Sequence, residues 1–78
     1  MRVILESTSK VIEVRDNAGK GVPARIWEGA TDSGILVHAY ITLIACRNVG
    51  DLSAFERELK EQRAPSRDVA AIPSRLVL

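Results

Sequence analysis

Short runs of β-branched residues alternate with polar clusters along the first half of the chain. Residues 2–6 (RVILE) and 10–15 (KVIEVR) are two such runs, and the polar residues 7–9 (STS) separate them. Polar clusters between β-branched runs are typical of a turn that joins two strands. The pattern therefore predicts a first hairpin within residues 2–15.

A second hairpin is predicted after the strongest turn signal in the chain. Residues 16–21 (DNAGKG) combine asparagine with two glycines, which accept the positive φ of tight turns. Two further β-forming runs, residues 22–28 and 35–47, flank another turn cluster at 31–34 (TDSG). This second hairpin, within residues 22–47, is expected to form the centre of a sheet.

The hydrophobic period changes from two to three or four in the second half of the chain. Three large apolar side chains share one helical face: Leu52, Phe55 and Leu59. Because Pro65 blocks continuation, an amphipathic helix is predicted over residues 52–62. Residues 66–71 are expected to make one short helical turn, and residues 74–78 a last strand that ties the carboxyl end into the sheet.

These elements define an α+β fold in a single domain that spans residues 1–78. We expect a mostly antiparallel sheet of four or five strands, with the amphipathic helix covering one face. In a chain of 78 residues one core only just offsets the conformational entropy of folding, and oligomerisation is a common remedy. The alternative is that the sheet curls into a small barrel and buries both faces by itself.

Side chains alternate between the two faces of the long strand at 35–47. One set is the expected core: Ile35, Val37, Ala39, Ile41, Leu43 and Ala45. The other set is more apolar than a solvated face requires: Leu36, His38, Tyr40, Thr42, Ile44 and Cys46. One helix covers only one face, so a target protein or a second copy is expected on the other. The candidate binding residues there are Trp27, Leu36, His38, Tyr40 and Ile44.

Charge and residue content narrow the choice of partner. The 11 Lys and Arg nearly balance the 10 Asp and Glu, so no global field favours nucleic acid or an anionic membrane. Three arginines near the carboxyl end, Arg63, Arg67 and Arg75, form a second candidate site for an acidic protein, a nucleotide or a nucleic-acid backbone.

Catalytic and metal chemistry find little support in the sequence. A single cysteine and a single histidine give neither a disulfide framework nor a structural zinc site. His38 and Cys46 are separated by roughly 26 Å along an extended strand, too far for a nucleophile and base pair. We therefore expect a non-enzymatic protein without metal or cofactor, in the cytoplasm of a bacterial host cell and without a membrane segment.

Seven short motifs occur along the chain: LESTSK at 5–10, VPARIWEG at 22–29, SGI at 33–35, VH at 37–38, RAPS at 63–66, IP at 72–73 and RLVL at 75–78. Together they resemble short uncharacterised proteins of temperate bacteriophages and prophages of proteobacteria. No activity comes with this resemblance. It implies a small protein that acts by binding.

The expected function is a phage-type antagonist that occupies a host or defence protein, or sequesters a small nucleotide signal. Its expected partners are a second copy of itself, in a homo-oligomer, and an unidentified host protein or nucleotide. Two alternatives remain open: a structural or accessory virion protein that works by self-assembly, and a small nucleic-acid-binding barrel.

Overall fold

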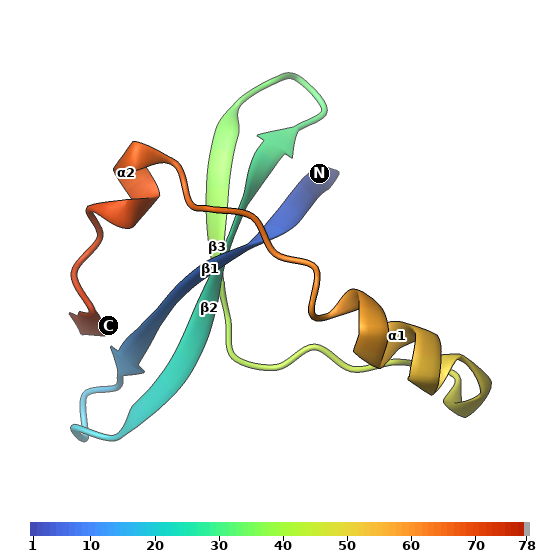
Figure 1. Cartoon of the computed structure of the whole chain (residues 1–78). Coiled ribbons are helices and arrows are strands. Elements are labelled where there is room, and N and C mark those ends of the chain that lie inside the picture. The colour runs from blue at the N-terminus through green and yellow to red at the C-terminus, as the bar shows by residue number, and fades with distance from the viewer. Residues whose placement is uncertain (78) are drawn as a thin grey trace.

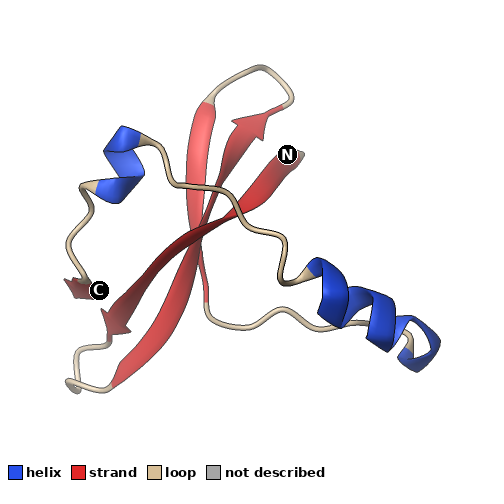
Figure 2. Cartoon of the chain, in the orientation of Figure 1, coloured by secondary structure: helices blue, strands red, loops and turns tan. Residues whose placement is uncertain are grey.

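The computed structural model describes residues 1–77 and has an α+β fold built on one open sheet (Figures 1 and 2). Four strands lie in the order β3-β2-β1-β4, with β4 parallel to β1 and the other pairs antiparallel. The elements are β1 Val3–Arg15, β2 Gly21–Thr31, β3 Leu36–Ile41, the 3-10 turn η1 Val49–Asp51, α1 Leu52–Glu58, α2 Arg67–Ala70 and β4 Arg75–Val77. The α+β prediction is confirmed, whereas the alternative of a closed barrel is wrong.

The first strand is continuous, so the predicted hairpin within residues 2–15 is wrong. Ser7 pairs with Trp27 and Val11 with Arg25, which leaves three residues of β1 opposite Ile26 alone. Such an excess of residues on one strand is a β-bulge. Thr8 is fully buried in it, where its Oγ1 donates to the Ile26 carbonyl oxygen at 2.6 Å. The polar cluster therefore bends one strand instead of joining two.

Both turns that were predicted from glycine-containing clusters are confirmed. Gly19 (φ 81°) lies between β1 and β2, and Gly34 (φ 88°) lies between β2 and β3. Glycine is suited to both positions because this left-handed region disfavours side chains. The β2–β3 hairpin matches the prediction for residues 22–47, except that β3 ends at Ile41 and residues 42–47 continue without regular structure.

The core lies between the sheet and α2. It consists of Ile12, Ala24, Ile26 and Val69, with Val14, Ile72 and Leu76 packed around them. Val69 belongs to the short helical turn predicted at 66–71, and it brings that turn onto β1 and β2.

The amphipathic helix does not cover the sheet, which corrects the predicted arrangement. α1 is shorter than residues 52–62 and has no buried residue. Figure 1 shows it projecting away from the strands, whereas α2 lies beside them. The apolar face of α1 therefore packs little within the chain, and its hydrophobic periodicity does not mark a helix that covers the core.

The carboxyl end joins the sheet as predicted. β4 pairs with residues 13–15 of β1, and the Glu13 N–H donates to the Ser74 carbonyl oxygen at 2.7 Å. The last residue of the predicted strand, Leu78, lies outside the described residues.

Candidate binding surfaces

The strand register separates the predicted binding residues onto two faces of the sheet. Tyr40 lies opposite Ile26, and His38 lies opposite Glu28, so both belong to the face on which α2 packs. We call this the covered face. Trp27 lies opposite Ala39 and therefore belongs to the other face, which we call the open face. The predicted grouping of Trp27 with His38 and Tyr40 is wrong.

The predicted core of the long strand is also wrong. Val37, Ala39 and Ile41 share the open face with Trp27 and are only half-buried. Ile35 and Leu43, at the two ends of that set, are 62% and 83% exposed. The buried strand residues instead lie on the same face as Ile26, because α2 packs on that face.

A buried carboxylate joins α2 to the covered face, and the sequence analysis missed it. Glu28 is 9% exposed and accepts hydrogen bonds from the Ser66 hydroxyl, from the Ser66 N–H at 2.8 Å and from Arg63 Nη1 at 3.0 Å. We call these three residues the Glu28 anchor. The hydroxyl and backbone hydrogen bonds from Ser66, and then the Arg63 guanidinium, hold the pKa of Glu28 below its ordinary value, although burial opposes them.

Two signals for the anchor were present in the sequence. Glu28 has the parity of Ala24 and Ile26 in a strand, so a buried Ile26 implied a buried Glu28. Ser66 comes directly before a short helix, where its side chain caps the Val69 N–H at 3.3 Å. What the sequence could not show is that these two residues meet across 38 positions.

A groove of about 860 Å³ runs along the covered face beside the Glu28 anchor. Leu36, His38 and Arg63 are among its lining residues, so it unites members of both predicted candidate sites. Next to it, His38 Nε2 lies 3.0 Å from the Tyr40 hydroxyl, with the two rings edge to face. Leu36 is 86% exposed at the other end of β3.

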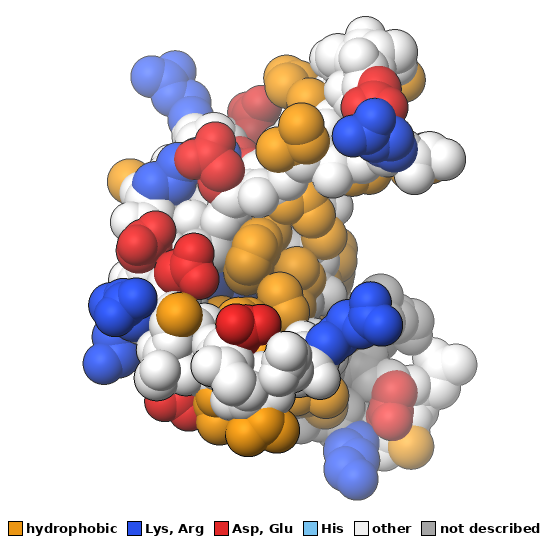
Figure 3. Space-filling view, turned by 90° about the vertical axis from the view of Figure 1, so that its right-hand side faces the viewer, with side chains coloured by type: hydrophobic (Ala, Val, Ile, Leu, Met, Phe, Trp, Pro, Cys, Tyr) orange, Lys and Arg blue, Asp and Glu red, His pale blue; other side chains and the backbone are white. Residues whose placement is uncertain are grey.

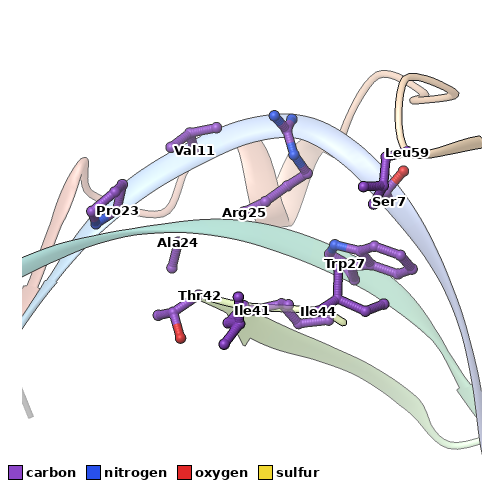
Figure 4. Close-up of a pocket in the computed structure, with 11 residues that line it drawn as sticks. Ser7, Val11, Pro23, Ala24, Arg25, Trp27, Ile41, Thr42, Ile44 and Leu59 are labelled. Atoms are coloured by element: carbon purple, nitrogen blue, oxygen red, sulfur yellow. The ribbon is translucent and has the colours of Figure 1, made fainter. Parts of the chain in front are cut away.

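A smaller hollow of about 250 Å³ lies on the open face. Figure 4 shows Trp27 and Ile44 in this hollow, together with Leu59 from the end of α1. Arg25 also lines the hollow, but its Nη1 donates to the Thr8 carbonyl oxygen at 2.9 Å. This bond gives a partner to a carbonyl group in the bulge of β1. The hollow is therefore mainly an apolar surface, formed by residues that the chain brings together from β2, the segment after β3 and α1.

The three carboxyl-terminal arginines lie on separate parts of the fold. Arg63 pairs with Glu28 and, through Nε, with Glu6 at 3.6 Å. Its backbone also bonds to β1: its N–H donates to the Ser7 carbonyl oxygen, and its carbonyl oxygen accepts from the Ser9 N–H. Arg67 begins α2 and Arg75 begins β4, and both are exposed. Arg63 is thus a structural residue, while Arg67 and Arg75 remain candidate contacts.

Comparisons with protein-family models, with curated proteins and with solved structures found no match for this chain. Within residues 1–77, no three His, Cys, Asp or Glu side chains are grouped in a way that would hold a metal ion. In the same part of the chain, neither helix has the length and apolar character needed to cross a membrane.

Proposed function

We propose that this chain is a binding protein, not an enzyme, and that it acts by occupying a protein partner. The observation that carries the proposal is the amount of apolar surface that the fold leaves uncovered. Four hydrophobic side chains are buried in the described part of the chain, whereas thirteen large ones are exposed. Four of the exposed ones line a single hollow on the open face: Val11, Leu43, Ile44 and Leu59. Exposed apolar side chains gathered in one place are typical of interaction sites.

The total surface area supports the same conclusion. The chain exposes 6066 Å². A compact monomer of 8.5 kDa is expected to expose about 4,700 Å², which is about 1,400 Å² less. Its radius of gyration of 13.9 Å likewise exceeds the roughly 11.5 Å expected for 78 residues. A standard protein interface covers about 800 Å² on each partner, so the excess is large enough for one.

The open-face hollow is the best candidate contact for a partner protein. It joins Trp27, Ile44 and Leu59 at one place, and aromatic side chains in apolar pockets are frequent binding hot spots. Figure 3 shows hydrophobic side chains gathered in a hollow between two projecting parts of the molecule. The resemblance to phage and prophage proteins favours a host or defence factor as the target, with an accessory role in the virion as the second possibility.

Capture of a host protein by matched variants tests the proposal. Ile44 and Val22 are both 42% exposed, but only Ile44 lines the open-face hollow. We expect the tagged wild-type chain and Val22→Lys to retain the same host protein from bacterial cells, and Ile44→Lys to lose it. Capture of nothing by the wild type, or equal capture by all three chains, would contradict the proposal. Abundance in purified virions, measured by mass spectrometry, would favour the accessory role instead.

A further inference from the structure

We propose that two copies of this chain pair antiparallel through their β3 strands and so form one continuous sheet of eight strands. This inference deepens the proposed function, because it names a second copy as one partner. It concerns the edge of the sheet, whereas the proposed contact with a host protein concerns the open-face hollow. The two can therefore fail separately.

β3 lies at the end of the strand order and has no features that prevent edge pairing. Its sequence, LVHAYI, contains no charged residue, no proline and no bulge. Natural proteins protect exposed edges with such features, since an unprotected edge offers free N–H and C=O groups to another strand. An edge of this kind is expected to be paired in the functional state.

On the opposite side of the sheet, the outer edge of β1 is largely paired. Arg63 bonds to Ser7 and Ser9 of β1 through its backbone, and β4 pairs with residues 13–15. Among the described residues the other edge strand is β4, which has three residues, whereas β3 has six. The longer edge favours a symmetric β3–β3 contact, which uses the same surface on both copies and ends at a dimer. A contact between two different edges would instead allow growth into a filament.

The hydrogen-bond pattern identifies which groups of β3 point outward. The Thr31 N–H donates to the Ile35 carbonyl oxygen, so Ile35 faces β2. Because inward and outward bonding alternate along an antiparallel strand, Val37, Ala39 and Ile41 also face β2. The N–H and C=O groups of three residues then face the open edge: Leu36, His38 and Tyr40.

When two copies meet around a twofold axis at His38, the outward N–H and C=O groups of one β3 lie opposite the outward C=O and N–H groups of the other. In that register the backbone of His38 pairs with His38 of the second copy, and Leu36 pairs with Tyr40 at both ends. The side chains of Leu36 and Tyr40 are then direct cross-strand neighbours, an aromatic and aliphatic pair that stabilises sheets. A strand without charge and a net charge of +1 for the chain add little repulsion.

The area supports a second copy as the occupant. The excess of about 1,400 Å² over a compact monomer exceeds the roughly 800 Å² that each partner buries in a standard interface. Leu36, which is 86% exposed, would be covered by such pairing. After one contact of that size, about 600 Å² of the excess remains.

Sedimentation equilibrium and amide hydrogen exchange test the pairing. The wild-type chain is expected to have a mass of twice 8.5 kDa. The amides of Leu36, His38 and Tyr40 should exchange slowly in the dimer and become fast on dilution, whereas those of Val37 and Ala39 stay slow. A monomeric wild type, or a dimer with fast exchange at the three outward amides, would overturn the proposal.

Two variants and one matched control extend this test. His38→Pro removes an outward N–H that β2 does not use, and proline is tolerated at such edge positions. Leu36→Lys introduces a charge at the contact, while Val49→Lys alters a residue of equal exposure, 86%, in η1. We expect the first two to be folded monomers and Val49→Lys to remain a dimer; dimers in all three would contradict the β3 contact.

The outcome is separable from that of the proposed function. Ile44→Lys should keep the dimer mass while losing the host protein. If the wild type is a monomer that still captures a host protein through Ile44, the pairing is wrong and the proposed function stands. If the wild type pairs through β3 but captures no host protein, the pairing stands and the proposed function is wrong.

Discussion

Replacing Glu28 with glutamine should destabilise the fold, because Glu28 is the polar link between α2 and the sheet. The carboxylate accepts two hydrogen bonds from Ser66 and one from Arg63. Glutamine keeps the size and one acceptor oxygen but turns an amino group toward a donor. The variant therefore removes charge and at least one hydrogen bond without creating a cavity.

The magnitude follows from the number of bonds and their charge. Hydrogen bonds to charged groups contribute about 1.5–3 kcal/mol, and a buried unsatisfied donor costs about 1–3 kcal/mol. Since the Ser66 hydroxyl can rotate to accept, we expect Glu28→Gln to lower the free energy of unfolding by about 2–3 kcal/mol. A chain of this length is stable by about 4–12 kcal/mol, and the loss corresponds to a decrease in Tm of about 10–20 °C.

Urea denaturation followed by tryptophan fluorescence measures this change. Trp27 is the only tryptophan, and its neighbour in sequence is Glu28. All chains should be compared at one protein concentration, because association stabilises the folded state. The matched control is Glu6→Gln, which removes the other partner of Arg63 at a side chain that is 73% exposed, and it should change stability by less than about 0.5 kcal/mol. Equal stability of Glu28→Gln and Glu6→Gln would refute the structural role of the anchor.

Three further predictions concern acid, the sheet contact and the bulge. In the folded chain the pKa of Glu28 is below its ordinary value of 4.5, so the stabilisation by its carboxylate is complete above pH 4.5. This stabilisation is lost as the pH falls through the lowered pKa of the folded state. The difference in unfolding free energy between wild type and Glu28→Gln should therefore shrink in acid below pH 4.5. A difference that is constant across this range would contradict it. Gly29→Ala should lower the free energy of unfolding by about 1–3 kcal/mol or more, because the added Cβ would overlap the backbone of Ile4. In the control Gly21→Ala, the Cβ meets only the flexible Glu13 side chain, so the free energy of unfolding should change less. Thermal unfolding of both variants measures the difference. Thr8→Val should cost about 1–3 kcal/mol by leaving the Ile26 carbonyl oxygen and the Lys10 N–H without their hydroxyl partner, and Thr8→Ser should retain most of the stability in the same urea assay.

Turn chemistry explains why most strand boundaries were predictable. The clusters around Gly19 and Gly34 require conformations that few residues accept, so their sequence determines the local structure. The STS cluster at residues 7–9 is different. Serine and threonine are compatible with a turn and with a bulge, and the choice depended on a buried bond between Thr8 and Ile26, which is a long-range contact.

The assignment of the two sheet faces depended on α2, which has only four residues. Hydrophobic periodicity favoured the longer α1 as the cover, because its stripe is easy to recognise. The actual cover is held by the polar Glu28 anchor and by one buried valine, Val69. A single carboxylate in a strand has no periodic signature, so sequence reasoning could not select the face on which the core forms.

The apolar run at residues 35–47 shows why hydrophobicity and burial within one chain can differ. The run predicted a central strand, but β3 is an edge strand and the residues after Ile41 leave the sheet. An edge strand that lacks charge exposes Leu36 and Tyr40 and leaves the outward N–H and C=O groups of three residues open to pairing with another strand. A second strand at this edge would cover these side chains and bond to these groups. The apolar run at residues 35–47 wrongly predicted a central strand within one chain. A strand at the centre of a dimeric sheet would nevertheless require the same uncharged sequence.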